Sequence, residues 1–423
     1  MHRQTKLKNG LASIFVPISG TKAVTIMILL SVGSRYENSR NNGVSHFVEH
    51  LMFKGTKKRP TTQHISRELD SVGAQFNAFT GKEYTGYYVK IGGAKQELAM
   101  DVLSDMLYNS KFDEAEIKRE KGVIMEEIKM YKDDPMSAVE DVIEKLMFGG
   151  HALGRNIAGT IQGIKQMSRA DLWDYYRGAY APKNMVLVAA GAINTKTKKL
   201  AEKYFGNYSA PVKIRKDDYD PFKKFINASF SKRVGVEKRK IDQAHVILAY
   251  PGLKKDDPKR YALAVLTNIL GGGMSSRLFV EVRERRGLAY RIRAEVINYR
   301  DTGAVFISTG LDQNRLKEAF VTIEAQVKRI ATELVSSKEL ADAKSNIAGH
   351  LTLAMENSHN QAQWFAENFL FFKKLESYEE AVAKIKKVTA KDVLNLAKII
   401  FKPQAKRVAV ISAKKKSQII KSL

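Results

Sequence analysis

Two histidines and a glutamate stand at helical spacing within residues 43–53. If this segment is a helix, His46, Glu49 and His50 occupy positions i, i+3 and i+4 and share one face. Both imidazoles can then reach one divalent cation. The other sides of the helix are apolar and consist of Phe47, Val48, Leu51 and Met52. The polar face therefore lies in a dry setting and needs partners, and a metal ion is one of them.

A histidine pair alone does not decide between a metal site and a hydrogen-bonded core. Buried histidines are often satisfied by ordinary hydrogen bonds. A catalytic zinc ion requires a third protein ligand, often a carboxylate, and an open position for water.

The helix predicted over residues 113–132 offers that carboxylate. Glu120 and Glu127 lie seven residues apart, two turns along one face, whereas Glu126 points about 100° away. The alternative is a solvated acidic face, which is the usual meaning of a run of charges.

The composition is that of a globular protein with more than one domain. The chain has 423 residues and no cysteine, so any zinc must be bound by nitrogen and oxygen atoms. The net charge of +26 is spread along the sequence, apart from a lysine cluster at residues 414–416. This distribution favours a solvated basic surface over nucleic-acid binding, for which we find no recognisable module.

No targeting or membrane segment is predicted. The N-terminal residues lack the pattern of a signal peptide, and the longest apolar run, Ala23 to Val32, is far shorter than the roughly 20 residues of a membrane-spanning helix. We therefore expect a cytoplasmic protein without a transmembrane segment.

Hydrophobic periodicity predicts segregated strands and helices, and so an α+β fold. The predicted strands of the first half are residues 11–16, 23–33, 75–80, 84–91 and 185–190. The predicted helices are residues 43–54, 62–73, 94–109, 113–132, 136–148, 169–178 and 195–206.

The second half repeats the first. Ser168 to Gly191 aligns without gaps on Thr389 to Ser412, and both read as an N-cap, a helix, a proline turn and a strand. We predict a first lobe at 1–211, a linker at 212–229 and a homologous second lobe at 230–423. The helix near 259–270 of the second lobe offers no metal ligand, so only the first lobe can bind the metal.

The motif His46-x-x-Glu49-His50, followed far along the chain by Glu127, resembles that of the pitrilysin family, the inverzincin metallopeptidases. The resemblance extends from the strand at 11 to the strand at 407 and includes the phrases HFVEHLMFKGT and GGGMSSRLFVEVRERRGLAY. In length and duplication the chain is similar to the two-lobed branch that includes the mitochondrial processing peptidase β subunit. This resemblance implies two homologous lobes, each a mainly antiparallel sheet with helices packed on one face.

The resemblance also implies the site. It implies one Zn²⁺ per chain, bound by His46, His50 and Glu127, with Glu49 as the general base. Glu120 then corresponds to the outer carboxylate that orients a ligating imidazole.

Further residues follow from the resemblance as substrate contacts. Arg283 and Tyr290 correspond to an arginine and a tyrosine that contact substrate near the zinc, and the partner subunit is expected to supply them. The segment Phe76, Asn77, Ala78 and Phe79 is similar to an edge strand on which substrates lie as an added β-strand. Without the resemblance, Arg283 reads as a surface arginine and Tyr290 as a half-buried core tyrosine.

We therefore predict a zinc metalloendopeptidase that hydrolyses peptides or unfolded polypeptides inside a dimeric chamber. A homodimer is favoured because the zinc ligands, Arg283 and Tyr290 occur in one chain, but a heterodimer with an inactive homologue stays open. The alternative function is a subunit that holds substrate or acts as a scaffold without being active alone.

Overall fold

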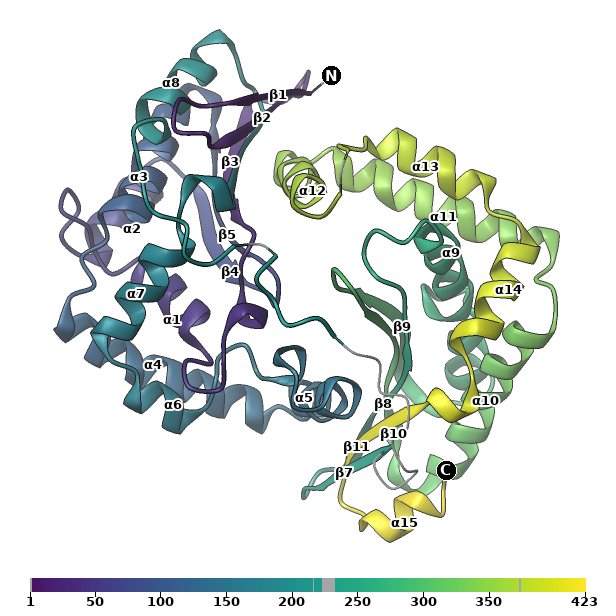
Figure 1. The fold of residues 1–423 in the computed structure, drawn as a ribbon. Coiled ribbons are helices and arrows are strands. Elements are labelled where there is room, and N and C mark those ends of the chain that lie inside the picture. The colour runs from purple at the N-terminus through teal and green to yellow at the C-terminus, as the bar shows by residue number, and fades with distance from the viewer. Residues whose placement is uncertain (1, 216, 223–232, 373) are drawn as a thin grey trace. The chain divides into compact units, whose positions relative to one another are not determined.

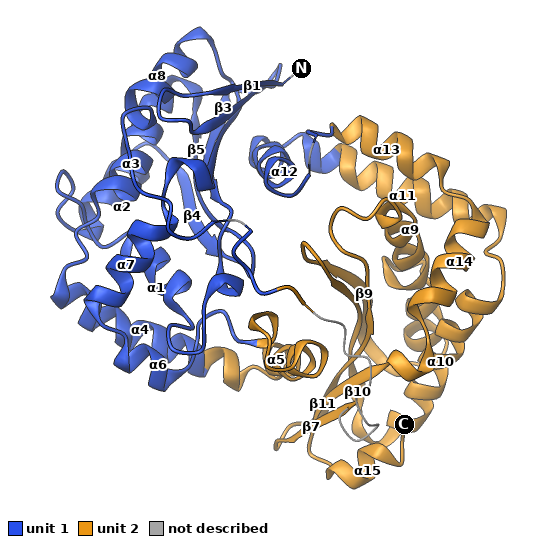
Figure 2. Ribbon diagram, in the orientation of Figure 1, with its two compact units in different colours: residues 1–129, 155–220, 353–376 blue, residues 130–154, 221–352, 377–423 orange. Residues whose placement is uncertain are grey.

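A computed structural model describes residues 2–215, 217–222, 233–372 and 374–423, and its chain is drawn in Figure 1. The chain forms two compact units, which Figure 2 distinguishes by colour. Unit 1 comprises Met1–Lys129, Arg155–Asp220 and Leu353–Glu376, and unit 2 comprises Met130–Gly154, Pro221–Thr352 and Ser377–Leu423. Each unit thus contains a segment from the other half of the sequence. The predicted linker at 212–229 lies partly outside the described residues.

A six-stranded sheet forms the centre of unit 1, with the strand order β1-β2-β6-β3-β5-β4. β2 and β6 are parallel, and the other neighbours are antiparallel. β4 is an edge strand, so in the part of the chain that the structure describes no strand pairs with its outer side. The strands are β1 (Arg3–Lys6), β2 (Ala12–Pro17), β3 (Ala23–Leu30), β4 (Gln75–Thr80), β5 (Thr85–Gly92) and β6 (Met185–Gly191).

Helices cover both faces of this sheet. Most of them bury their apolar sides with one face of the sheet in a core that includes Phe47 and Leu51. The opposite face is covered by α12, a helix from the second half of the sequence, through Phe365 and neighbouring side chains. The helices of unit 1 are α1 (Val44–Leu51), α2 (Thr62–Asp70), α3 (Gln96–Asn109), α4 (Glu114–Asp133), whose last turn passes into unit 2, α6 (Ile161–Gln166), α7 (Arg169–Ala179), α8 (Thr195–Phe205) and α12 (Ser358–Phe371).

Unit 2 repeats this design around a five-stranded sheet with the order β7-β11-β8-β10-β9. β7 and β11 are parallel, as β2 and β6 are, and β9 is an edge strand, as β4 is. Helix α5, from the first half of the sequence, packs on one face of this sheet through Ile143 and Phe148. The strands are β7 (Val234–Lys238), β8 (Gln243–Pro251), β9 (Ala289–Asn298), β10 (Gly303–Asp312) and β11 (Arg407–Ser412).

The opposite face of the second sheet packs against most of the remaining helices in a separate core. The helices of unit 2 are α5 (Pro135–Phe148), α9 (Arg260–Gly271), α10 (Leu316–Thr332), α11 (Ser337–Met355), whose last residues belong to unit 1, α13 (Tyr378–Lys387), α14 (Ala390–Ile400) and α15 (Lys416–Ile420), with a π-helix at Phe279–Glu284.

The predicted duplication and the α+β class are confirmed. In the first copy the Ser168 hydroxyl and the Asp171 carboxylate form a capping box that starts α7, and in the second copy Thr389 and Asp392 do the same for α14. Each helix leads through a short 3₁₀ turn into a fully buried strand, β6 or β11. The lobe boundaries at 211 and 230 stay a prediction, because α5 and α12 each pack in the unit formed mainly by the other half.

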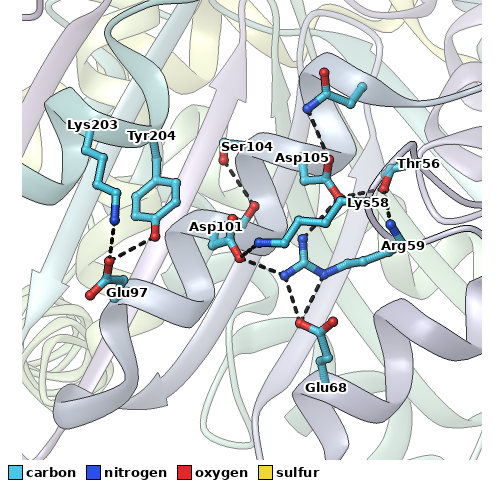
Figure 3. A network of polar contacts seen from close by, with 11 residues as sticks. Thr56, Lys58, Arg59, Glu68, Glu97, Asp101, Ser104, Asp105, Lys203 and Tyr204 are labelled. Atoms are coloured by element: carbon cyan, nitrogen blue, oxygen red, sulfur yellow. Dashed lines mark hydrogen bonds and ion pairs between the residues drawn. The ribbon is translucent and has the colours of Figure 1, made fainter.

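The loop after α1 is fixed by a buried arginine (Figure 3). The Arg59 side chain is 1% exposed, and its guanidinium donates to Glu68, Asp101 and Asp105. The Thr56 hydroxyl donates to Asp105, and the Ser110 hydroxyl donates to the Leu51 carbonyl at the end of α1. These contacts hold the C-terminal end of α1 against α3. Among the described residues, no helix is long and apolar enough to span a bilayer.

Candidate metal centre

The helix that carries the histidines begins at a glycine and a buried carboxylate. Gly43 has a left-handed backbone conformation with φ of 99°, which favours glycine. The backbone N–H groups of Gly43 and Ser45 donate to the Glu37 carboxylate, each at 2.8 Å. Glu37 thereby satisfies two of the free N–H groups at the start of α1, while its burial raises the pKa of its carboxyl against the lowering effect of these hydrogen bonds. Sequence analysis did not identify Glu37, because it precedes the helix by a loop.

The apolar face of α1 is buried as predicted. Phe47 and Val48 are fully buried, and Leu51 is nearly so. His46 and His50 lie on the remaining face, with their side chains 13% and 20% exposed. Their ring centroids lie 4.6 Å apart.

Helix α4 brings Glu127 to the two imidazoles. The Glu127 Oε2 atom lies 3.6 Å from His46 Nε2 and 3.5 Å from His50 Nε2. One ligand atom from each of the three residues lies within 4.8 Å of the others, so the three residues form a group that could hold a metal ion. Glu126 points away from this group, with its side chain 73% exposed, and pairs with Lys129.

The donor atoms fit a tetrahedral zinc site. Bond lengths of 2.0–2.1 Å to a tetrahedral ion place its ligand atoms about 3.4 Å apart. The two N–O separations of 3.5 and 3.6 Å are close to that value and at or beyond the long limit for hydrogen bonds. Two imidazole nitrogens and one carboxylate oxygen are also a donor set that zinc accepts in catalytic sites.

A second carboxylate contacts His50 at Nδ1, the ring nitrogen that does not face Glu127. Glu120 is 2% exposed, and its Oε2 atom lies 3.1 Å from His50 Nδ1, which leaves His50 Nε2 directed at Glu127. Its Oε1 atom lies 2.7 Å from Lys54 Nζ. Burial acts to raise the pKa of Glu120, but the bonds to His50 and Lys54 outweigh it and hold this pKa below its usual value.

The two imidazoles differ electrostatically. Burial, together with the nearby His50, lowers the pKa of His46 to about 4, so this ring is neutral. Burial also acts to lower the pKa of His50, but the hydrogen bond with Glu120 and the nearby Glu127 carboxylate outweigh it and raise the pKa to about 9. In the metal-free protein an imidazolium at His50 therefore supplies the positive charge between the two carboxylates.

Glu49 lies beside the histidines and is held by a threonine. The Thr80 hydroxyl, at the end of β4, donates to Glu49 Oε2. Burial raises the pKa of Glu49, against the opposing effect of the Thr80 hydrogen bond. A carboxylate with a raised pKa is a stronger base than an ordinary one. Sequence analysis missed Thr80 and Lys54, whose roles depend on tertiary contacts.

The remaining predicted residues lie on the edge strands of the two sheets or, in the case of Arg283, in the π-helix that packs against β9. Phe76 to Phe79 belong to the edge strand β4 of unit 1, next to α1. In unit 2 the Arg283 guanidinium lies 4.8 Å from the centre of the Tyr290 ring, and Tyr290, on the edge strand β9, is 79% exposed. Tyr290 is therefore not a core residue. Both side chains line a groove of about 500 Å³ together with Gly271 to Met274.

Comparisons with known proteins agree with this fold. Residues 15–161 match the model of insulinase, peptidase family M16, and residues 166–347 match the model of the peptidase M16 inactive domain. An uncharacterized zinc protease of Bacillus subtilis is 35% identical over 95% of this chain and 96% of its own length. One of Streptomyces coelicolor is 34% identical over 94% of this chain and 87% of its own length.

Solved structures share the fold at lower sequence identity. A protease from Helicobacter pylori has a TM-score of 0.91 at 22% identity, with 97% of this chain and 99% of that chain covered. A chain of complex III2 from Candida albicans has a TM-score of 0.81 at 17% identity, with 99% of each chain covered. The resemblance inferred from the histidine motif is confirmed, and the chain belongs to the pitrilysin-like peptidase family M16.

Proposed function

We propose that this protein is a zinc-dependent metalloendopeptidase that binds one Zn²⁺ per chain through His46, His50 and Glu127. The observation that carries the proposal is the convergence of two imidazole nitrogens on one carboxylate oxygen at 3.5 and 3.6 Å. The zinc proteases among its relatives support the same class of enzyme.

Zinc supplies a Lewis acid that polarises a scissile carbonyl and lowers the pKa of a water molecule toward ~7. Glu49 lies beside the ligands and acts as the general base, accepting a proton from the attacking water and passing it to the leaving amine. Thr80 holds one oxygen of Glu49, which fixes the direction of the other. Glu120 fixes the ring of His50 through its Nδ1 atom.

The substrate lies as an added strand along β4 in this proposal. The free edge of β4 at Phe76 to Phe79 offers main-chain hydrogen bonds, which bind extended peptides with little regard for sequence. In a folded protein most extended segments are already paired within its own sheets, whereas an unfolded chain leaves them available for pairing at this edge. Peptides and unfolded polypeptides are therefore the proposed substrates.

The second half supplies the remaining contacts in this proposal. Arg283 orients the substrate backbone, and the exposed Tyr290 hydroxyl donates to the oxyanion that develops on the carbonyl. We propose that both come from a second copy of the chain in a homodimer that closes around the substrate.

A substrate-holding subunit is the second candidate. It is favoured by the match of residues 166–347 to an inactive domain, whose helix α9 carries neither histidine nor carboxylate. This candidate predicts a chain that binds peptides but cleaves them only with a distinct partner.

The test is cleavage of an unstructured quenched peptide by the purified full chain, with zinc content and mass in solution measured on the same sample. The enzyme proposal predicts turnover, its loss with a chelator and a dimeric mass. A chain that contains zinc but does not cleave would favour the substrate-holding subunit.

A mixing experiment tests the contribution of the second copy. Glu49→Gln chains and Arg283→Ala chains are each expected to be nearly inactive, but co-expressed mixtures form heterodimers with one complete site. Partial recovery of turnover supports contacts from the partner, and no recovery contradicts them.

A further inference from the structure

A lysine completes the polar face of the metal helix. Lys54 follows His50 by four residues, as His50 follows His46, just beyond the end of α1. These three residues meet two carboxylates of α4: Glu127 lies between the two imidazoles, and Glu120 lies between His50 and Lys54.

The Lys54 contact satisfies a buried carboxylate oxygen. Glu120 is 2% exposed, so neither of its oxygens can rely on water. Its Oε2 atom accepts from His50 Nδ1 at 3.1 Å and its Oε1 atom accepts from Lys54 Nζ at 2.7 Å. The two bonds pull on opposite oxygens and therefore set the rotation of the carboxylate.

The contact between Lys54 and Glu120 also compensates charge at the site. Glu120 and Glu127 lie two turns apart on one helix face and repel each other. A zinc ion at Glu127 compensates that carboxylate directly, whereas the charge of Glu120 is compensated through Lys54, which is 24% exposed.

We propose that Lys54 is a positioning residue of the metal centre, which holds the Glu120 carboxylate in the orientation that fixes the His50 ring for metal binding. The inference rests on the proposed zinc site and extends it to a residue that is neither one of the three proposed ligands nor the proposed base. Loss of Lys54 leaves Glu120 Oε1 buried without its cation, so the carboxylate turns and releases His50 Nδ1.

The primary test measures zinc affinity by competition with a chromophoric chelator, using the full chain. Lys54→Met keeps most of the apolar stem and removes the ammonium, and we expect it to weaken zinc binding about 10- to 100-fold. Lys54→Arg restores a cation and should recover most of the affinity. Lys57→Met is the matched control, because Lys57 lies in the same loop but is exposed, and we expect no change.

A double-mutant cycle separates positioning from a general effect of charge. If Lys54 acts through Glu120, then Lys54→Met should weaken zinc binding little further in a Glu120→Gln background. Equal fold-changes in both backgrounds, or wild-type affinity in Lys54→Met, would overturn the inference.

Circular dichroism of each metal-free variant shows whether it is folded, and Lys54→Arg provides a folded comparison if Lys54→Met is not. A wild-type chain that binds no zinc would contradict the proposed function itself, whereas zinc binding unaffected by Lys54→Met contradicts only the role of Lys54.

Discussion

The helix pairs α1/α4 in the first half and α9/α11 in the second half have the same place in the duplicated fold but different polar faces. Five buried apolar positions of α9 coincide with buried apolar positions of α1 and with Met52, the residue that follows α1, when the helices are aligned. The matching pairs are Val44 and Ala262, Phe47 and Val265, Val48 and Leu266, Leu51 and Ile269, and Met52 and Leu270.

The partly exposed sides of these helices have diverged. In this alignment Ala264 and Asn268 of α9 replace His46 and His50 of α1. Asn268 Nδ2 donates to Asn346 Oδ1 of α11 at 2.9 Å, an ordinary amide pair between the two helices. The fold therefore needs only the apolar side of the helix, and the candidate chemistry depends on a few polar residues that the second half lacks.

The largest expected effect comes from replacing the two histidines of α1 with the residues at the equivalent positions of α9. The double substitution His46→Ala and His50→Asn removes both imidazole ligands, and we expect zinc content to fall from one ion per chain to none. The buried side of α1 is unchanged, so circular dichroism should show a folded chain. A folded variant that still binds one zinc ion would place the metal elsewhere.

A smaller effect is expected from the contact that holds Glu49. Thr80→Val removes the hydroxyl that donates to the carboxylate, and a hydrogen bond to a charged group contributes about 1.5–3 kcal/mol. We expect kcat to fall about 10- to 100-fold with little change in KM or zinc content. Thr80→Ser keeps the hydroxyl and should recover most of kcat. An unchanged kcat in Thr80→Val would show that Thr80 does not position Glu49 for catalysis.

The smallest expected effect is the change of zinc affinity over one pH unit, which is about tenfold. It is specific to α1, because Asn268 at the equivalent position of α9 does not titrate. The pKa of His50 in the metal-free protein is raised to about 9 and that of His46 is lowered to about 4, so near neutral pH one proton must leave His50 when zinc binds. The Kd for zinc should therefore fall about tenfold for each pH unit gained between about pH 6 and about pH 8. A Kd that does not change with pH, after correction for the chelator, would mean that His50 is already neutral.

Features that depend on local sequence pattern could be predicted. The apolar period of α1 predicted its buried side, and β4 has the predicted bounds Gln75–Thr80. The repeated capping boxes at Ser168 and Thr389 predicted the two equivalent helices. Glu127 could be predicted as a candidate ligand because its seven-residue spacing from Glu120 places both carboxylates on one face of the helix.

Features that depend on tertiary partners could not be predicted. Both α5 and α12 have helical patterns, but an apolar stripe does not specify which sheet will cover it. Lys54 and Thr80 read as ordinary loop and strand residues until folding brings them to Glu120 and Glu49. Tyr290 was ambiguous because a tyrosine suits both a core and a surface.

The most direct measurement of the central claim compares zinc content and peptide turnover in Glu49→Gln and in the wild type. Glu126→Gln is the matched control, since Glu126 lies on the exposed side of α4 and pairs with Lys129. We predict one zinc ion per chain in all three proteins and a loss of turnover of about 10²- to 10⁴-fold in Glu49→Gln alone. Wild-type turnover in zinc-loaded Glu49→Gln would contradict the account.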